Sequence, residues 1–147
     1  MRKLSWTLFA GLLAFQLTAV AGLPWMTDLP KAQEQARKEN KLVLLDFTGS
    51  DWCTWCQRLD KEVFSTKEFA SFAKTNLVLV EIDFPDQKKQ RPSLKKANEA
   101  LQQKFQAESY PTIIVLNSEG KEVWRQVGYL EGGPKVWLTL LSALKRK

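Results

Sequence analysis

Three short apolar segments constrain the fold of this 147-residue chain more strongly than any other feature. They cover Leu42–Phe47, Leu77–Ile82 and Thr112–Leu116, and branched side chains dominate each of them. Apolar runs of this length are typical of strands that are buried on both faces of a sheet. The last run is followed by the turn-like segment Asn117–Gly120 and by Lys121–Arg125, which together predict a terminal β-hairpin.

Segments rich in helix-forming residues alternate with these strands. The sequence predicts helices over Pro30–Lys41, a segment that includes Arg58–Val63, Lys67–Lys74, Ser93–Ala107 with Ser93 as the N-cap, and the residues after Gly132-Gly133-Pro134. This order combines parallel crossover connections with a hairpin. We therefore expect a single α/β domain of three layers, in which a central mixed sheet carries helices on both faces.

Cysteine occurs only twice, at Cys53 and Cys56, shortly after the first predicted strand. If Cys53 opens a helix, the two residues lie one turn apart on the same face. Their α-carbons are then about 5–6 Å apart, which is compatible with a disulfide. A helix N-terminus would stabilise the thiolate of Cys53 and make it the attacking sulfur, while Cys56 resolves the mixed disulfide. The pair predicts a reversible dithiol–disulfide couple.

The absence of histidine from the sequence narrows the chemistry of this pair. A structural zinc site needs four ligands, drawn mainly from cysteine and histidine. Attachment of c-type haem needs a histidine directly after the second cysteine, and a Cys–His hydrolase would lack its base. No metal and no other cofactor is expected. A static disulfide that only fastens the turn stays an open alternative, although closing so short a loop gains little chain entropy.

The first 21 residues have the composition of an export signal. Arg2 and Lys3 supply positive charge, Leu4–Val20 is mostly apolar, and Ala19-Val20-Ala21 matches the small-x-small pattern that signal peptidase cleaves. We expect a signal peptide over residues 1–21, cleavage near Ala21, one domain over residues 22–147, and a periplasmic or secreted protein. An uncleaved membrane anchor is the alternative, but polar residues interrupt an apolar run that is barely long enough to span a bilayer.

The charge of the chain bears on its partners. Removal of Arg2 and Lys3 with the signal peptide would lower the formal net charge from +6 to +4. The remaining excess is modest and dispersed over helix-like segments, which favours solubility and argues against nucleic-acid binding. Thiols outside the cytosol tend to oxidise, so a working dithiol there needs a redox partner.

Three separated motifs, in this order, resemble the thioredoxin superfamily. They are a strand that ends in Leu45-Asp46-Phe47, the helix start Trp52–Cys56, and Tyr110-Pro111-Thr112 before the hairpin. The resemblance covers roughly residues 25–144. The stretch Phe47–Cys53, followed by Lys61–Phe64, is similar to exported bacterial thioredoxin-like proteins and to the periplasmic thioredoxin-like domain of thiol:disulfide interchange proteins.

The resemblance implies a role for each matching residue. Cys53 is the nucleophile and Cys56 the resolving thiol. Pro111 follows a cis peptide bond from Tyr110 and places backbone beside the dithiol to hold an extended substrate segment; a trans proline at a strand start is the alternative. Asp46 matches a buried acid that moves protons to and from Cys56, and burial should raise its pKa. A hydrogen-bonded aspartate at a strand end is the structural alternative.

The sequence departs from the family pattern in three respects. Thr54-Trp55 stands between the cysteines in place of Gly-Pro, and one extra residue separates Asp46 from Cys53. Leu79 occupies the position where a lysine often lies near the buried acid. The redox potential and the proton route of ordinary thioredoxin therefore cannot be transferred to this chain.

The surroundings of the cysteines favour a reductase. A histidine between them, which would stabilise the thiolate, is missing, and Asp51 adds negative charge two residues before Cys53. Both features oppose the thiolate and push the couple toward the reducing end. Trp52 and Trp55 flank the pair and are expected to form a hydrophobic docking surface, unless packing accounts for them.

We expect a monomeric protein-disulfide reductase that acts on disulfide-containing exported proteins and is recharged by a membrane dithiol donor. Two alternatives stay open. One is an oxidase or isomerase, although no separate dimerisation segment of the kind isomerases use is visible. The other is a binding protein on a thioredoxin scaffold, in which the disulfide is structural and the aromatic surface holds a partner.

Overall fold

The computed structural model describes residues 22–145. The predicted signal peptide over residues 1–21, its cleavage site at Ala21 and the final two residues lie outside this range. Within it, every helix is too short or too polar to cross a membrane.

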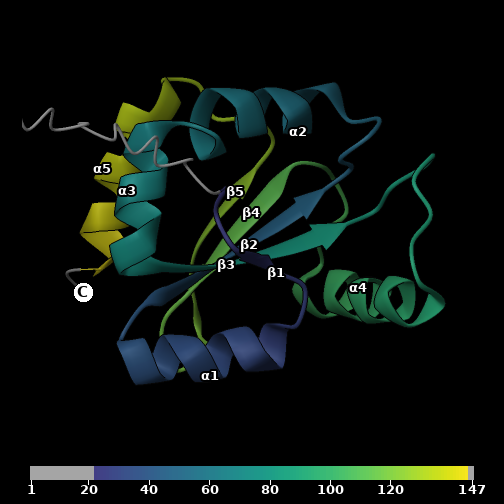
Figure 1. The fold of residues 1–147 in the computed structure, drawn as a ribbon, viewed down its shortest axis with the longest axis horizontal. Helices are drawn as coiled ribbons and strands as arrows, with labels where there is room; N and C mark the ends of the chain where they lie inside the picture. Colours follow the sequence, from purple (N-terminus) through teal and green to yellow (C-terminus); the bar gives the residue numbers. More distant parts are fainter. Residues whose placement is uncertain (1–21, 146–147) are drawn as a thin grey trace, which may run out of the picture.

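A five-stranded mixed sheet forms the centre of the structure (Figure 1), with its strands in the order β1-β3-β2-β4-β5. The strands are β1 (Trp25–Met26), β2 (Leu42–Thr48), β3 (Leu77–Asp83), β4 (Thr112–Leu116) and β5 (Glu122–Val127). β3 runs parallel to both β1 and β2, whereas β4 is antiparallel to β2 and β5 is antiparallel to β4. The mixed sheet and the terminal hairpin are as predicted.

Helices cover both faces of the sheet. They are α1 (Leu29–Glu39), α2 (Thr54–Leu59), the π-helical turn η1 (Asp60–Phe64), α3 (Lys67–Asn76), α4 (Pro92–Phe105) and α5 (Gly133–Lys145). Figure 1 shows α1 and α4 on one side of the sheet and α2, α3 and α5 on the other. The predicted three-layer arrangement is confirmed.

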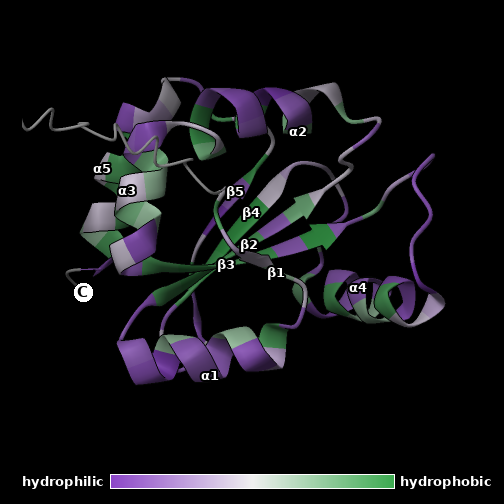
Figure 2. Ribbon diagram, in the orientation of Figure 1, coloured by the Kyte–Doolittle hydropathy of each residue, from purple (hydrophilic) through white to green (hydrophobic). Residues whose placement is uncertain are grey.

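Alternation along the buried strands creates two separate cores. In β2, Leu42 and Leu44 pack toward α2, α3 and α5, whereas Val43, Leu45 and Phe47 pack toward α1 and α4. Successive side chains in a strand point to opposite faces, so a strand covered on both sides must be apolar throughout. In Figure 2 the inner strands β2, β3 and β4 are accordingly mostly green, while α1 is mostly purple. Within β2, the buried polar residues Asp46 and Thr48 are the exceptions to this rule.

Two details of the elements differ from the sequence-based expectation. Ser93 is not the N-cap of α4; Arg91 is the cap and Pro92 is the first helical residue. Proline suits that position because its missing N–H would have no partner in the first turn. The two-residue strand β1 was not predicted, because pairing with Leu79 and Val80 of β3, not local sequence, makes it a strand.

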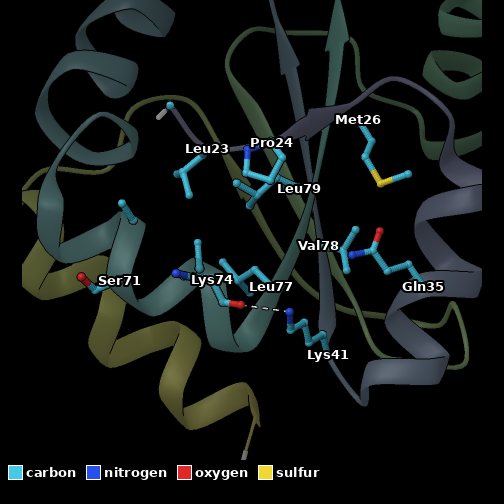
Figure 3. Close-up of a pocket in the computed structure, with 13 residues that line it drawn as sticks. Leu23, Pro24, Met26, Gln35, Lys41, Ser71, Lys74, Leu77, Val78 and Leu79 are labelled. Carbon is cyan, nitrogen blue, oxygen red and sulfur yellow. Dashed lines mark hydrogen bonds between the residues drawn. The ribbon is translucent and has the colours of Figure 1, made fainter. Parts of the chain in front are cut away.

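One sizeable cavity lies away from the cysteines. It has a volume of about 730 Å³ and is lined by the N-terminal segment, α1, α3 and β3 (Figure 3). Leu23, Met26 and Leu77–Leu79 form its apolar wall, and Lys41 and Lys74 lie at its rim. None of the site residues predicted from the sequence lines it. The two cysteines lie at the other end of the strands, after β2.

Candidate active site

The turn after β2 places the two cysteines at the start of α2. The N–H of Cys53 donates to the carbonyl oxygen of Gly49 over 2.8 Å, which closes the turn. Cys53 is the N-cap of α2, and its Sγ accepts a hydrogen bond from the N–H of Cys56 over 3.2 Å. A disulfide joins the two residues, with α-carbons 5.3 Å apart, and both are buried. The predicted helix-start geometry is confirmed.

Trp52 is held firmly in place although half of it is exposed. Its Nε1–H donates to the carbonyl oxygen of Phe84 over 2.8 Å. Its ring meets Tyr110 edge to face, with centroids 5.8 Å apart. A Cβ on Gly49 would lie 2.4 Å from the indole, so only glycine leaves room for this arrangement. The exposed indole beside Cys53 is therefore a fixed surface.

The Tyr110–Pro111 peptide bond is cis, as the resemblance implied. The ring of Tyr110 contacts Trp52, the residue directly before Cys53, so the cis bond lies on the same side of the molecule as the dithiol. The Tyr110 hydroxyl accepts a hydrogen bond from Gln102 over 2.6 Å, and burial raises its pKa. The carbonyl oxygen of Pro111 accepts from the N–H of Gly128, so this backbone segment is fixed at both ends.

Trp55, which lies between the two cysteines in sequence, belongs to a second aromatic cluster. Its ring lies 5.6 Å from that of Tyr129, and the guanidinium of Arg58 lies over both rings, 5.5 Å and 4.7 Å from their centroids. Glu62 accepts hydrogen bonds from the Tyr129 hydroxyl and from Nε of Arg58. The two contacts, that with Tyr129 first, lower the pKa of Glu62. Trp55 itself stays 53% exposed.

The residues that support Trp55, namely Arg58, Glu62 and Tyr129, were not predicted from the sequence. The spacing of Arg58 and Glu62, four residues apart on one helix face, was a usable signal for an ion pair. Tyr129 lies 67 residues from Glu62 along the chain, and no local pattern connects them. Trp52 and Trp55 are thus both about half exposed, and neighbouring residues hold each of them in place.

Asp46 is the buried acid that the sequence predicted. Its residue is 8% exposed, and its Oδ1 has no hydrogen-bond partner among the described residues. Burial raises the pKa of Asp46 well above its ordinary value, and the negative charges of Glu81, Asp60 and Asp83 raise it further. The expected direction of the shift is therefore confirmed.

A cavity of about 230 Å³ connects Asp46 with Cys56. Asp60 and Glu81 also line it. Glu81 is the register partner of Asp46 on β3, whereas Leu79 pairs with Leu44 one step back on the same face. The residue directly opposite the buried acid is therefore a second carboxylate.

Asp51 makes contacts that the sequence did not suggest. Its carboxylate oxygens accept hydrogen bonds from the backbone N–H groups of Asp86, Gln87 and Lys88 over 2.8–2.9 Å. These bonds, that from Asp86 first, lower the pKa of Asp51. Asp51 is thus ionised. Its carboxylate binds the loop after β3 to the cysteine turn, so its charge does not act on the cysteines alone.

The fold and the cysteine pair define the class of protein. A family model described as a thioredoxin-like domain matches residues 29–144, and the chain belongs to this family. It is a thiol–disulfide oxidoreductase. The predicted superfamily, fold class and enzyme class are confirmed.

Three relatives place the chain more closely. It is 33% identical over 128 residues to the disulfide bond reductase DsbH of Chlamydia pneumoniae, an alignment that covers 86% of this chain and 76% of DsbH. It is 30% identical over 101 residues to the thioredoxin-related protein DsbJ of the same organism, covering 69% of this chain. It is 27% identical over 136 residues to the thiol:disulfide interchange protein DsbD of Pasteurella multocida, covering 90% of this chain. The chain spans only 29% of DsbJ and 22% of DsbD.

The solved structure of a DsbH oxidoreductase matches with a TM-score of 0.79 and 29% identity. The match covers 92% of this chain and 93% of that chain. The similarity to DsbH therefore extends over essentially the whole described domain.

Proposed function

We propose that the protein reduces disulfides in exported proteins through Cys53 and Cys56. The observation that carries the proposal is the cavity that joins Cys56 to Asp46, a buried carboxyl group with one oxygen that has no hydrogen-bond partner among residues 22–145. A disulfide that only stabilised a turn would not need a buried carboxyl group next to its second cysteine. A buried carboxyl next to the second cysteine suits proton transfer during disulfide exchange.

The reaction has two steps under this proposal. The Cys53 thiolate attacks one sulfur of the substrate disulfide, and the other substrate sulfur leaves as a thiolate that takes up a proton. Cys56 then gives its proton to Asp46 and attacks Sγ of Cys53. This attack forms the Cys53–Cys56 disulfide and releases the second substrate thiol. Two electrons pass to the substrate, so an external dithiol must reduce the pair before the next cycle.

Acidic groups near the pair support the reducing direction. Stabilisation of the cysteine thiolate favours the reduced form and makes a couple oxidising. Here Asp46, Asp60 and Glu81 share a cavity with Cys56 and supply no positive charge. The name of the relative DsbH, disulfide bond reductase, points the same way.

Substrate binding is assigned to the two aromatic clusters. Trp52, with Tyr110 and Pro111, offers a fixed surface and a backbone segment for an extended substrate chain. Trp55 offers a second exposed ring, 53% accessible. The proposal places the protein in the periplasm or outside the cell, after cleavage near Ala21, with a membrane dithiol donor as the source of electrons.

The reduction potential of the pair tests the direction. The mature protein is equilibrated with mixtures of reduced and oxidised dithiothreitol, and the dithiol fraction is counted by thiol alkylation and mass spectrometry. A value near about −270 mV supports a reductase. A value between about −120 and −180 mV, the range of oxidases and isomerases, overturns the direction.

Two serine variants test the mechanism. Cys53→Ser should abolish turnover, and Cys56→Ser should accumulate a covalent complex with the substrate, seen on a non-reducing gel. Wild-type multiple turnover by Cys56→Ser would contradict the two-cysteine mechanism. A pair that resists mild reductant, with partner binding unchanged by alanine at both positions, would instead identify a binding protein with a structural disulfide.

A further inference from the structure

Within residues 22–145, the charged groups that shift the pKa of Asp46 are all acidic. Glu81 and Asp83 of β3 and Asp60 of η1 all raise its pKa by their negative charge. From β4 its register partner is Ile113, which is uncharged. From α2 the titratable group that shares its cavity is Cys56. Burial and then Asp83 raise the pKa of Glu81, and Lys88 offsets part of that rise; Lys88 is not among the groups that shift the pKa of Asp46.

Two of these three acids are engaged elsewhere. The carboxylate of Asp83 accepts hydrogen bonds from the N–H and the hydroxyl of Ser50, over 2.9 Å and 2.6 Å. The carboxylate of Asp60 accepts from the hydroxyl of Ser65 over 3.2 Å and 3.3 Å. Glu81 differs, because no group within residues 22–145 donates a hydrogen bond to its carboxylate.

Glu81 also has the most suitable position. It is the register partner of Asp46 on the adjacent parallel strand, and both lie on the sheet face that α2 covers. Adjacent strands are about 4.8 Å apart, so the two side chains leave the sheet side by side. Asp46 is buried, whereas Glu81 is only partly buried. Both line the cavity that contains Cys56, and its 230 Å³ has room for water between them.

We propose that Glu81 is a positioning residue of the reaction, which passes protons between solvent and Asp46 and sets the pH at which Asp46 can accept the Cys56 proton. This inference rests on the proposed function. In the reducing half of the cycle, Asp46 first gives its proton to Glu81, which releases it to solvent. The Asp46 carboxylate then takes the proton of Cys56 as that sulfur attacks Cys53. When the pair is reduced again, the same proton returns to Cys56 and Asp46 is reloaded through Glu81.

The proposal predicts the sign of a pH effect. The negative charge of Glu81 holds the proton on Asp46, so its removal should let Asp46 ionise at lower pH. Because Glu81 lies on the neighbouring strand, loss of its charge in Glu81→Gln should move the Asp46 midpoint down by about one pH unit. Glu81→Lys should move it further, because a positive charge replaces the negative one.

The first measurement is a carbon-13 carboxyl NMR titration of Asp46 in the oxidised protein, for wild type, Glu81→Gln and Glu81→Lys. Glu99→Gln is the matched control, because it removes one exposed carboxylate from α4 on the opposite face of the sheet. The expected result is a downward shift of the midpoint that grows from Gln to Lys and is absent in Glu99→Gln. An unchanged Asp46 midpoint in both Glu81 variants overturns the proposal. If the glutamine variant folds poorly, the result for the lysine variant decides.

The second measurement is the rate at which the reduced protein is oxidised by oxidised glutathione, from pH 5 to pH 9. The acid limb of this rate should move down with the Asp46 midpoint in Glu81→Gln. In the Cys56→Ser background, Glu81→Gln should not change the rate of mixed-disulfide formation at Cys53, because Asp46 serves only the second step. A shifted midpoint with an unmoved acid limb overturns the role of Glu81. Failure of Cys56→Ser to form any mixed disulfide overturns instead the proposed two-cysteine function.

Discussion

The replacement of Asp46 by asparagine should change how the stability of the protein depends on pH. Asp46 is buried, its Oδ1 is unpartnered within the described chain, and its pKa is raised by burial and then by Glu81, Asp60 and Asp83. In the unfolded chain its pKa returns to about 3.9. Between that value and the raised native value, the native protein binds one proton more than the unfolded chain. Stability therefore falls as pH rises through this window.

The size of this effect follows from the proton count alone. One bound proton changes the free energy of unfolding by about 1.4 kcal/mol for each pH unit, once the pH is about one unit above the unfolded pKa. The asparagine variant lacks this titration. Within this window its stability relative to wild type should therefore rise with pH, by at most about 1.4 kcal/mol for each pH unit.

Urea denaturation of the oxidised proteins, followed by tryptophan fluorescence at pH 5, 5.5 and 6, measures this difference. Oxidised protein is used so that the cysteines do not titrate. Parallel stability curves for wild type and Asp46→Asn would refute the reasoning, because they would mean that native Asp46 holds no extra proton. The same variant should accumulate the mixed disulfide during turnover, since Cys56 then lacks its proton acceptor.

Three further predictions concern the turn, the docking surface and the leader. Gly49→Ala should displace the Trp52 indole and break its hydrogen bond to Phe84, which should lower the free energy of unfolding in urea by about 1–3 kcal/mol. Gly22→Ala is the control, because a Cβ at Gly22 meets nothing within 4 Å. A Gly49→Ala variant as stable as wild type would contradict this prediction. Trp55→Ala should raise KM for a disulfide-bonded protein about tenfold while leaving the rate with oxidised glutathione unchanged. An equal loss of activity with both substrates would argue against a docking role for Trp55. The intact mass of the exported protein should correspond to a chain that begins at Gly22, and a mass that includes residues 1–21 would show the uncleaved anchor.

The sequence by itself determined the long buried strands and the reactive pair. Strand β2 is apolar over nearly its whole length because helices cover both of its faces, and this condition leaves a pattern within seven consecutive residues. The cysteines lie three residues apart, so one helical turn is enough to bring them together. The raised pKa of Asp46 could be expected for the same reason, since a carboxyl within an apolar strand is buried with it.

The tertiary structure alone decided which groups meet that pair. Glu81 opposes Asp46 because of the register between β2 and β3, and a slip of two residues would have put Leu79 there instead. Tyr129 reaches Trp55 from the end of the hairpin, and the loop at Asp86–Lys88 reaches Asp51 across 35–37 residues of sequence. Local patterns extend over a few residues, whereas register and loop docking depend on the packing of the whole domain. The cysteines, Asp46 and the two tryptophans were therefore visible in the sequence, whereas the contacts of Glu81 and Tyr129 with them were not.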